Sequence, residues 1–380
     1  MTDTGAVVAD LPLIDAHCHP IAAGTPDPAT FALAATEADV APPAGHSALD
    51  GPAGLAIRRW CPPVLGLPAG APIGDYLARR AELGAAEAGR RLLRAAGLSQ
   101  LLVDTGLDGP ELASPAELGT AAGAGVHEVV RLERVAERLA ERGVSASGFA
   151  AAYRDALAAA TVDAVAVKSV LAYRSGFSDE VAERPSPTKV RTAVGRWLAE
   201  TARPDRAGRV RLDDPVLARF VLWCGIDRGL PVQIHTGFGD RDLRLAAADP
   251  ALLQPFLVAA EPSGVPIVLL HCYPFHRRAG WLAQVFPHVY VDVGLTVAQV
   301  GARAHAVIGE CCELAPFGKL LFSTDGYALP ELYLVGAAQF RHSFGRLLGA
   351  WVTDGAMSAE DAHRVAGMVG AGNARRLYRL

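Results

Sequence analysis

Two histidines separated by a single residue close an apolar segment near the start of the chain. The segment from Leu11 to Pro20 reads LPLIDAHCHP, and its apolar residues lead directly into His17 and His19. In an extended chain, residues i and i+2 point to the same face, so both imidazoles would aim at one point from the end of one strand. Cys18, between them, would point to the opposite face and pack. Imidazole is a common metal ligand near neutral pH, but a chance pair of histidines has the same pattern, so the rest of the chain must decide.

Residues of metal-binding type also lie within or at the ends of later apolar segments. They are Lys168 in VDAVAVKSV, His235 in PVQIHTG, His271 in PIVLLHC and Asp325 in LLFSTDG. A lone histidine at a strand end is more often structural than a ligand. Here, however, four of the chain's 11 histidines would converge if these strands lie side by side. Four imidazoles and a carboxylate suit a borderline divalent ion, Zn²⁺ first, with Mn²⁺ or Fe²⁺ as alternatives.

Lys168 lies inside an apolar segment, where a charged ammonium is costly to bury and tends to lose its proton. A neutral lysine can take up CO₂ and form a carbamate, an anion that can bridge two metal ions. The alternatives are an ion pair with Glu133 or Asp104 and a contact with a carboxylate of the substrate.

Eight strand-like segments alternate with mostly helical ones and would position these residues. The first ends at His19, and the other seven span residues 101–106, 127–133, 162–170, 231–237, 266–272, 289–294 and 320–326. Several are almost continuously hydrophobic, as expected of parallel strands covered on both faces. Eight such units favour an α/β fold of the closed (β/α)₈ (TIM) barrel type over an open doubly wound sheet. In a barrel of this type the chemistry lies at the C-terminal ends of the strands.

Residues 21–98 form a connection that is too long for a simple link between two strands. A short helix is expected around Phe31 to Glu37. The sequence from Ile73 to Ala96 is typical of a helix, which Gly97 would end. We therefore expect a helical insertion after the first strand that caps one end of a single domain spanning residues 1–380.

The chain closes with two short helical segments. Ser358 is expected to cap the first, and Asn373 is expected to be the N-cap of the last, in the string GNARRLYRL.

The order of the candidate ligands resembles the amidohydrolase superfamily, with HxH on the first strand, histidines on the fifth and sixth, and aspartate on the eighth. The strings IDAHCHP, AVKSVLAYRSG, IHTG, LLHCYP, VDVG, STDG and GNARRLY are similar to the amidohydrolase-2 family of TIM-barrel metal-dependent hydrolases. Within it, they are most similar to the barrel half of nodulin- and FluG-type fusions to glutamine synthetase. The resemblance runs from about Leu11 to Leu380. It includes no synthetase domain, and the chemistry of glutamine synthetase is therefore not carried over.

The resemblance implies one or two divalent ions and metal-activated water as the nucleophile. In the two-ion form, the ligands of one ion are His17, His19, carbamylated Lys168 and Asp325, and those of the other are the carbamate, His235 and His271. The ions would polarise the scissile carbonyl, while Asp325 passes a proton to the leaving amine. In the one-ion form, His271 steers or deprotonates the water and Lys168 contacts the substrate.

Substrate contacts are expected in the loops that follow the strands. Arg174, just after Lys168, could hold a carboxylate in a bidentate fork or pair with the acidic stretch 179–183. Glu37 and His46 of the insertion could reach the mouth. Residues that directly follow ligand-bearing strands, and that could either line the pocket or pack, are Tyr173, Tyr273, His276 and Tyr327.

Composition excludes several classes of protein. The 380-residue chain has a formal net charge of −4 with scattered basic residues, which predicts no nucleic-acid partner. No apolar run reaches about 18 residues, which predicts no membrane span. The absence of a targeting segment, together with six cysteines and no CxxC pair, predicts a reduced, cytoplasmic protein. A homodimer is the default expectation for a soluble enzyme.

We therefore expect a metal-dependent hydrolase that cleaves an amide-type C–N bond of a small, carboxylate-bearing substrate. One alternative is a metal-dependent decarboxylase, a lyase of a small or aromatic carboxylic acid on the same ligands. Another is a non-catalytic barrel, against which the intact ligands at all five positions argue.

Overall fold

The computed structural model describes residue 8 and residues 10–107, 111–201 and 210–380. Eight parallel strands form one sheet in the order of the sequence. The strands are β1 (Leu13–Cys18), β2 (Leu98–Asp104), β3 (Gly125–Arg131), β4 (Ala166–Ser169), β5 (Val232–Thr236), β6 (Ile267–His271), β7 (Val289–Asp292) and β8 (Leu320–Leu321). Main-chain hydrogen bonds of 3.0 Å from Ala16 N to Phe322 O and from Asp325 N to His17 O join the two ends of the sheet. The predicted (β/α)₈ barrel is therefore confirmed.

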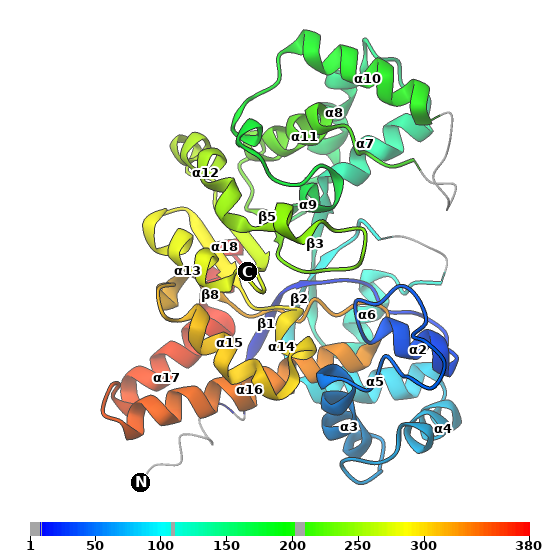
Figure 1. Cartoon of the computed structure of the whole chain (residues 1–380), viewed down its shortest axis with the longest axis vertical. Coiled ribbons are helices and arrows are strands. Elements are labelled where there is room, and N and C mark those ends of the chain that lie inside the picture. Colours follow the sequence, from blue (N-terminus) through cyan, green and yellow to red (C-terminus); the bar gives the residue numbers. More distant parts are fainter. Residues whose placement is uncertain (1–7, 9, 108–110, 202–209) are drawn as a thin grey trace.

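Helices surround the strands and fill the connections between them (Figure 1). They are α2 (Pro28–Ala34), α3 (Pro52–Val64), α4 (Ile73–Leu83), α5 (Ala85–Ala96), α6 (Pro115–Ala122), α7 (Leu132–Glu141), α8 (Phe149–Ala160), α9 (Leu171–Arg174), α10 (Pro187–Thr201), α11 (Pro215–Asp227), α12 (Gln254–Ala260), α13 (His276–Val285), α14 (Thr296–Gln299), α15 (Ala304–Cys311), α16 (Pro330–Thr353), α17 (Ala359–Gly367) and α18 (Asn373–Tyr378). None of the helices in the described part of the chain combines the length and the apolar content needed to cross a bilayer.

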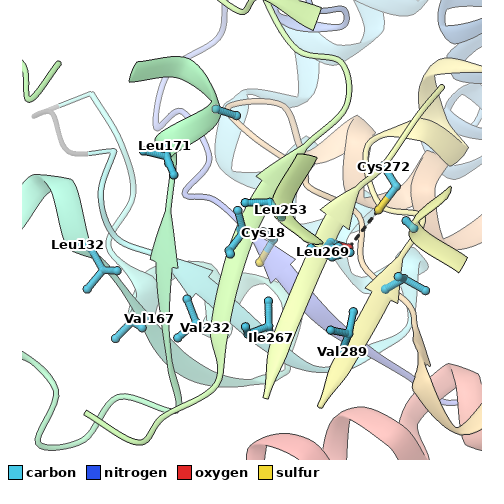
Figure 2. Close-up of a cluster of buried hydrophobic side chains, with 14 of the residues drawn as sticks. Cys18, Leu132, Val167, Leu171, Val232, Leu253, Ile267, Leu269, Cys272 and Val289 are labelled. Carbon is cyan, nitrogen blue, oxygen red and sulfur yellow. Dashed lines mark hydrogen bonds between the residues drawn. The ribbon is translucent and has the colours of Figure 1, made fainter. Parts of the chain in front are cut away.

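The strands are apolar on both faces because helices cover the outside and side chains fill the inside. Figure 2 shows outward-facing residues of neighbouring strands, such as Val167, Val232 and Ile267, packed together in the large outer cluster. Inward-facing residues, among them Val129 and Val268, form a separate cluster inside the barrel. Burial on both faces explains the nearly continuous hydrophobic runs of these strands.

Helix α18 closes the barrel at the end opposite the candidate ligands, because its residues Ala374, Leu377 and Tyr378 belong to the inner cluster. The prediction that Asn373 caps this helix is wrong. Asn373 lies within the first turn, and its Nδ2 donates to Phe317 O and Leu320 O, at 2.7 and 2.8 Å. The buried Asn373 amide donates to these two carbonyls instead of capping the helix terminus. Both hydrogen bonds fasten α18 to the start of β8.

The insertion between β1 and β2 contains α2 to α5, which lie beside α16 (Figure 1). Its apolar residues pack in a cluster of their own with Leu332 and Val335 of α16. A buried ion pair joins the same elements, since Arg80 Nε lies 2.7 Å from Glu331 Oε1. Tyr76 Oη donates to the same carboxylate at 2.8 Å. The insertion is thus attached to the barrel by both apolar packing and a buried polar network.

Local glycines and prolines explain where the helices of the insertion differ from expectation. The helix predicted from Ile73 to Ala96 is two helices, because Gly84 has φ of 78° and breaks it. Gly97 ends α5 in the left-handed region with φ of 61°, as predicted. Helix α3 was not expected, because it contains Pro62 and Pro63 in its last turn and proline usually interrupts a helix. Ser358 caps α17 as predicted, since its Oγ accepts from Asp361 N at 2.9 Å. That residues 21–98 act as a cap stays a prediction.

Candidate metal centre

Both histidines of β1 face the barrel interior because the alternation of side chains changes phase within the strand. Ala16 belongs to the inner cluster, and the pairing with β2 is irregular between Asp15 and Cys18. An irregularity of this kind re-aims the side chains that follow it. His17 and His19 therefore both reach the centre, while Cys18 packs in the outer cluster, as predicted.

A carboxylate from the end of the barrel sheet meets both histidines. The Nε2 atoms of His17 and His19 lie 3.2 and 3.3 Å from Asp325 Oδ1. One ligand atom from each of the three residues lies within 4.8 Å of the others, a separation that suits a metal ion. His271 Nε2 approaches the other carboxylate oxygen at 3.7 Å.

The other two predicted ligands lie against this group. Lys168 Nζ is 3.1 Å from His17 Nε2, and the rings of His235 and His271 are 4.7 Å apart. The barrel therefore brings all six predicted ligands together. Lys168 has neither of the predicted ion pairs, because Arg131 pairs with Asp104 at 2.7 Å. Carbamylation of Lys168 stays a prediction.

Buried carboxylates hold the chain segments that carry these side chains. Asp292 accepts from His271 N at 2.6 Å and from Ser323 Oγ at 2.7 Å. Asp15 accepts from Thr324 N at 2.8 Å. These bonds explain why β8 ends at Leu321, whereas a strand was predicted through residue 326. Beyond Leu321 the chain bonds to these carboxylates as well as to main-chain atoms of β1, and it no longer forms a regular strand.

Glu133, which was considered a partner of Lys168, serves the segment after β4 in the same way. Its Oε1 accepts from Ser169 Oγ at 2.7 Å and from Val170 N at 3.0 Å. Glu133 therefore positions the end of the strand that carries Lys168, without contacting its amine.

Burial sets the charge of the candidate ligands. It lowers the pKa of His17 to about 4 and that of His271 to about 3, so both imidazoles are neutral at pH 7. Burial also raises the pKa of Asp325, but the neighbouring histidines outweigh it and hold this pKa well below the ordinary value. For Lys168, burial lowers the pKa to about 8 against the opposing charges of Asp104 and Asp325.

The donor set fits a divalent metal ion. Asp325 Oδ1 and His235 Nε2 are buried and have no hydrogen-bond partner within the described residues. A buried polar atom without a partner costs free energy, and a cation between the histidine nitrogens and the carboxylate would satisfy it. Neutral imidazole nitrogens and a carboxylate oxygen are typical ligands of Zn²⁺. His17, His19, His235, His271 and Asp325 are thus suited to hold it.

A cavity of about 620 Å³ opens above these residues. His17 lies beneath its surface, whereas the other five candidate ligands line it. We call these five residues, with His17 below them, the floor. We call the remaining lining residues the wall. They come from the insertion and from the loops after the strands, and they include Glu37, Arg131, Tyr173, Arg174, Arg211, Asp240 and Tyr327.

The structure brings three of the five predicted substrate residues to the cavity, namely Tyr173, Arg174 and Tyr327. Tyr273 and His276 are not part of its lining. Their rings stack on each other at an interplanar angle of 7°. His276 Nε2 also lies 2.7 Å from Glu310 Oε2, so the turn after β6 directs this residue away from the mouth.

Arg174 pairs with Glu137 at 3.2 Å rather than with the acidic stretch 179–183. Of the two insertion residues that were expected near the mouth, Glu37 lines the cavity and His46 is exposed outside it. Sequence reasoning missed Arg131 and Arg211. Arg131 closes β3 and follows the same strand-end rule as the ligands, whereas Arg211 lies in an irregular loop that carries no signal.

Comparisons with known proteins identify a matching family and a related sequence. A family model described as amidohydrolase matches residues 14–380. The protein fluG of Emericella nidulans is 32% identical over 243 residues, which are 61% of this chain and 27% of that protein. The chain therefore spans only about a quarter of the length of this relative.

Two solved structures share the architecture. A Lactobacillus casei protein named as a metal-dependent hydrolase superposes with a TM-score of 0.84 and 26% identity, and the match covers 100% of this chain and 98% of that one. The uronate isomerase of Thermotoga maritima has a TM-score of 0.59 and 15% identity, with 100% and 98% covered. At that identity the isomerase supports the barrel fold alone.

Proposed function

Since the chain belongs to the amidohydrolase family, we propose that it is a metal-dependent hydrolase of an amide-type C–N bond in a small, carboxylate-bearing substrate. The observation that carries this proposal is the group of His17, His19 and Asp325 at the floor of the cavity, with ligand atoms within 4.8 Å of one another. The neutral state of the buried histidines and the ionised state of the carboxylate support it.

A bound Zn²⁺, Mn²⁺ or Fe²⁺ would supply an activated water and polarise the scissile carbonyl. The chain's own residues provide the proton transfers. Asp325 accepts the proton of the attacking water, and its position beside three histidines keeps it ionised for that role. The same carboxylate delivers the proton to the leaving amine. In the one-ion form His271, from β6, would steer or deprotonate the water and Lys168 would contact the substrate. In the two-ion form both residues would serve as ligands, Lys168 as a carbamate.

The wall supports a substrate with a carboxylate. Arg174 is mostly buried, and Arg131 and Arg211 line the same cavity. Of the Arg174 guanidinium nitrogens, Nη2 bonds to Glu137, while no hydrogen bond of Nη1 is found among the described residues. That nitrogen remains able to donate to a carboxylate in the cavity, and hydrogen bonds between charged groups are among the strongest that proteins make.

A screen of the Zn- and Mn-loaded protein tests the proposal against its rivals. Amides, lactones and aromatic carboxylates are supplied, and released amine and CO₂ are both measured. We expect amine from carboxylate-bearing amides. Release of CO₂ from aromatic acids would identify a decarboxylase instead. A metal-loaded protein that turns over none of these compounds would favour the non-catalytic barrel.

A further inference from the structure

Gln233 lies across the barrel interior, below the candidate ligands, and is completely buried. It belongs to β5, but its side chain reaches β1 and α18. Its Oε1 is 2.8 Å from His17 Nδ1, and its Nε2 is 2.7 Å from Ala16 O and 2.9 Å from Tyr378 Oη. Both hydrogens of the amide and one lone pair of its oxygen therefore have partners in the chain.

These contacts fix which way the amide faces. Ala16 O is a carbonyl oxygen and can only accept, so the Gln233 group beside it must be the NH₂. The two hydrogens of that group are then donated to Ala16 O and to Tyr378 Oη. The carbonyl oxygen of the amide must face His17 Nδ1.

An amide oxygen facing Nδ1 selects one tautomer of His17. Oε1 cannot donate, so Nδ1 carries the hydrogen, and a neutral imidazole then has its lone pair on Nε2. That lone pair faces both Lys168 Nζ, at 3.1 Å, and Asp325 Oδ1, which has no hydrogen-bond partner in the described part of the chain. Two acceptors 3.2 Å apart form a site that a cation would stabilise.

We infer that Gln233 and Tyr378 are positioning residues that hold His17 in its metal-binding tautomer. The inference rests on the proposed metal-dependent function. It gives the last helix a role in the chemistry, since Tyr378 stands on α18 at the opposite end of the barrel. Asn373 fastens that helix to the entry of β8 through two carbonyls, so the amide, the tyrosine and β8 form one connected support.

Partners of this kind, behind a ligating histidine, typically change metal affinity by about 10- to 100-fold when they are removed. We therefore expect Gln233→Met, which has a similar volume but only a weak thioether acceptor, to raise the Kd for Zn²⁺ by about that factor. Tyr378→Phe removes only an acceptor for the amide and is expected to raise this Kd roughly two- to tenfold. Gln233→Glu keeps an oxygen opposite Nδ1 and should bind Zn²⁺ more tightly than Gln233→Met.

The chain offers a matched control. Gln100 Oε1 lies 2.8 Å from His127 Nε2, the same kind of pair at the same distance, on β2 and β3 and outside the cavity. Gln100→Met should leave the Kd for Zn²⁺ unchanged. The Kd values are measured by chelator competition on protein stripped of metal, with circular dichroism to confirm folding.

Nitrogen-15 NMR of histidine-labelled, metal-free protein reads the tautomer directly, with His17→Gln to assign the signal. We expect a protonated Nδ1 in the wild type and a mixture of tautomers in Gln233→Met. An unchanged tautomer and an unchanged Kd in folded Gln233→Met would overturn the inference. If that variant does not fold, Tyr378→Phe decides, and a Kd equal to the wild type would count against it. A wild type with the expected tautomer but no affinity for Zn²⁺, Mn²⁺ or Fe²⁺ would instead refute the proposed function.

Discussion

The floor and the wall of the cavity differ in how the chain holds them. The candidate ligands of the floor stand at the ends of strands of one sheet, and buried carboxylates such as Asp15 and Asp292 bond the segments that carry them. The wall is made by loops and by the insertion, and it is joined across the mouth by the exposed pair of Asp39 and Arg241 at 3.5 Å. The floor is therefore suited to fixed chemistry, and the wall to the choice of substrate.

The two regions also differ in protonation. In the floor, burial keeps His17 and His271 neutral, and the histidines keep Asp325 ionised at any pH near neutral. In the wall, burial, followed by the charges of Asp325 and Asp240, raises the pKa of Glu37 to about 8. Ordinary changes of pH should therefore alter the charge of Glu37 in the wall and of Lys168 in the floor, whose pKa is also about 8, while the histidines and Asp325 keep theirs.

The largest effect is expected from the floor. Asp325→Asn removes the group that transfers the proton, so kcat should fall by about 10²- to 10⁴-fold with the barrel still folded. Hydrolysis assays and far-ultraviolet circular dichroism check this. A folded variant that retains wild-type kcat would show that Asp325 is not the proton carrier.

The attachment of the insertion should be the next most sensitive feature. Arg80→Met leaves the buried carboxylate of Glu331 without its ion pair, and such changes cost about 3–5 kcal/mol of unfolding free energy. Arg79→Met is the control, because its pair with Glu82 is exposed and contributes about 0–1 kcal/mol. Urea unfolding compares them, and equal losses in both variants would refute the role of the buried network.

A change in the wall should affect binding more than catalysis. Arg174→Met removes a charged donor from the cavity, so KM for carboxylate-bearing amides should rise by about 10- to 100-fold, with a smaller change in kcat. Arg277→Met, which removes an exposed pair with Glu313, is the control. If KM rises equally for amides without a carboxylate, Arg174 does not bind the substrate carboxylate.

The smallest effect is expected on the way in which the stability of the metal-free protein depends on pH. The folded pKa of Glu37, about 8, exceeds its ordinary value of 4.5, so this carboxyl adds stability below pH 4.5 that is lost as the pH rises toward 8. His17 acts in the opposite sense. Its folded pKa of about 4 lies below 6.5, so its contribution is present above pH 6.5 and is lost as the pH falls toward 4.

Glu37→Gln should therefore remove the part of the stability loss, measured by urea unfolding, that Glu37 causes as the pH rises from 4.5 toward 8. The loss that His17 causes as the pH falls from 6.5 toward 4 should remain. A variant whose stability between pH 4.5 and 8 changes as in the wild type would show that Glu37 does not titrate in this range.

The sequence predicts the floor well because strand ends of a parallel barrel must converge. His17, His235 and Asp325 could thus be found from position in the strand alone. Side-chain partners across the barrel are less visible. Gln233 lies inside an apolar run, and its bond to His17 depends on a contact between residues 216 positions apart. The wall was the least predictable part, because the course of the loops decides which residues line the cavity. Tyr273 and His276 do not line it, whereas Arg211 does.

The metal content of the wild type and of His17→Ala decides whether the floor of the cavity binds a divalent ion. Both proteins are purified gently, metal per chain is measured by mass spectrometry of the elements, and amide hydrolysis is assayed on the same samples. We expect at least one divalent ion per wild-type chain, and the loss of both metal and activity in a folded His17→Ala variant. A count near two, with the mass gain of a carbamate, would add the bridging role of Lys168. A His17→Ala variant that retains both metal and activity would contradict the assignment of the site.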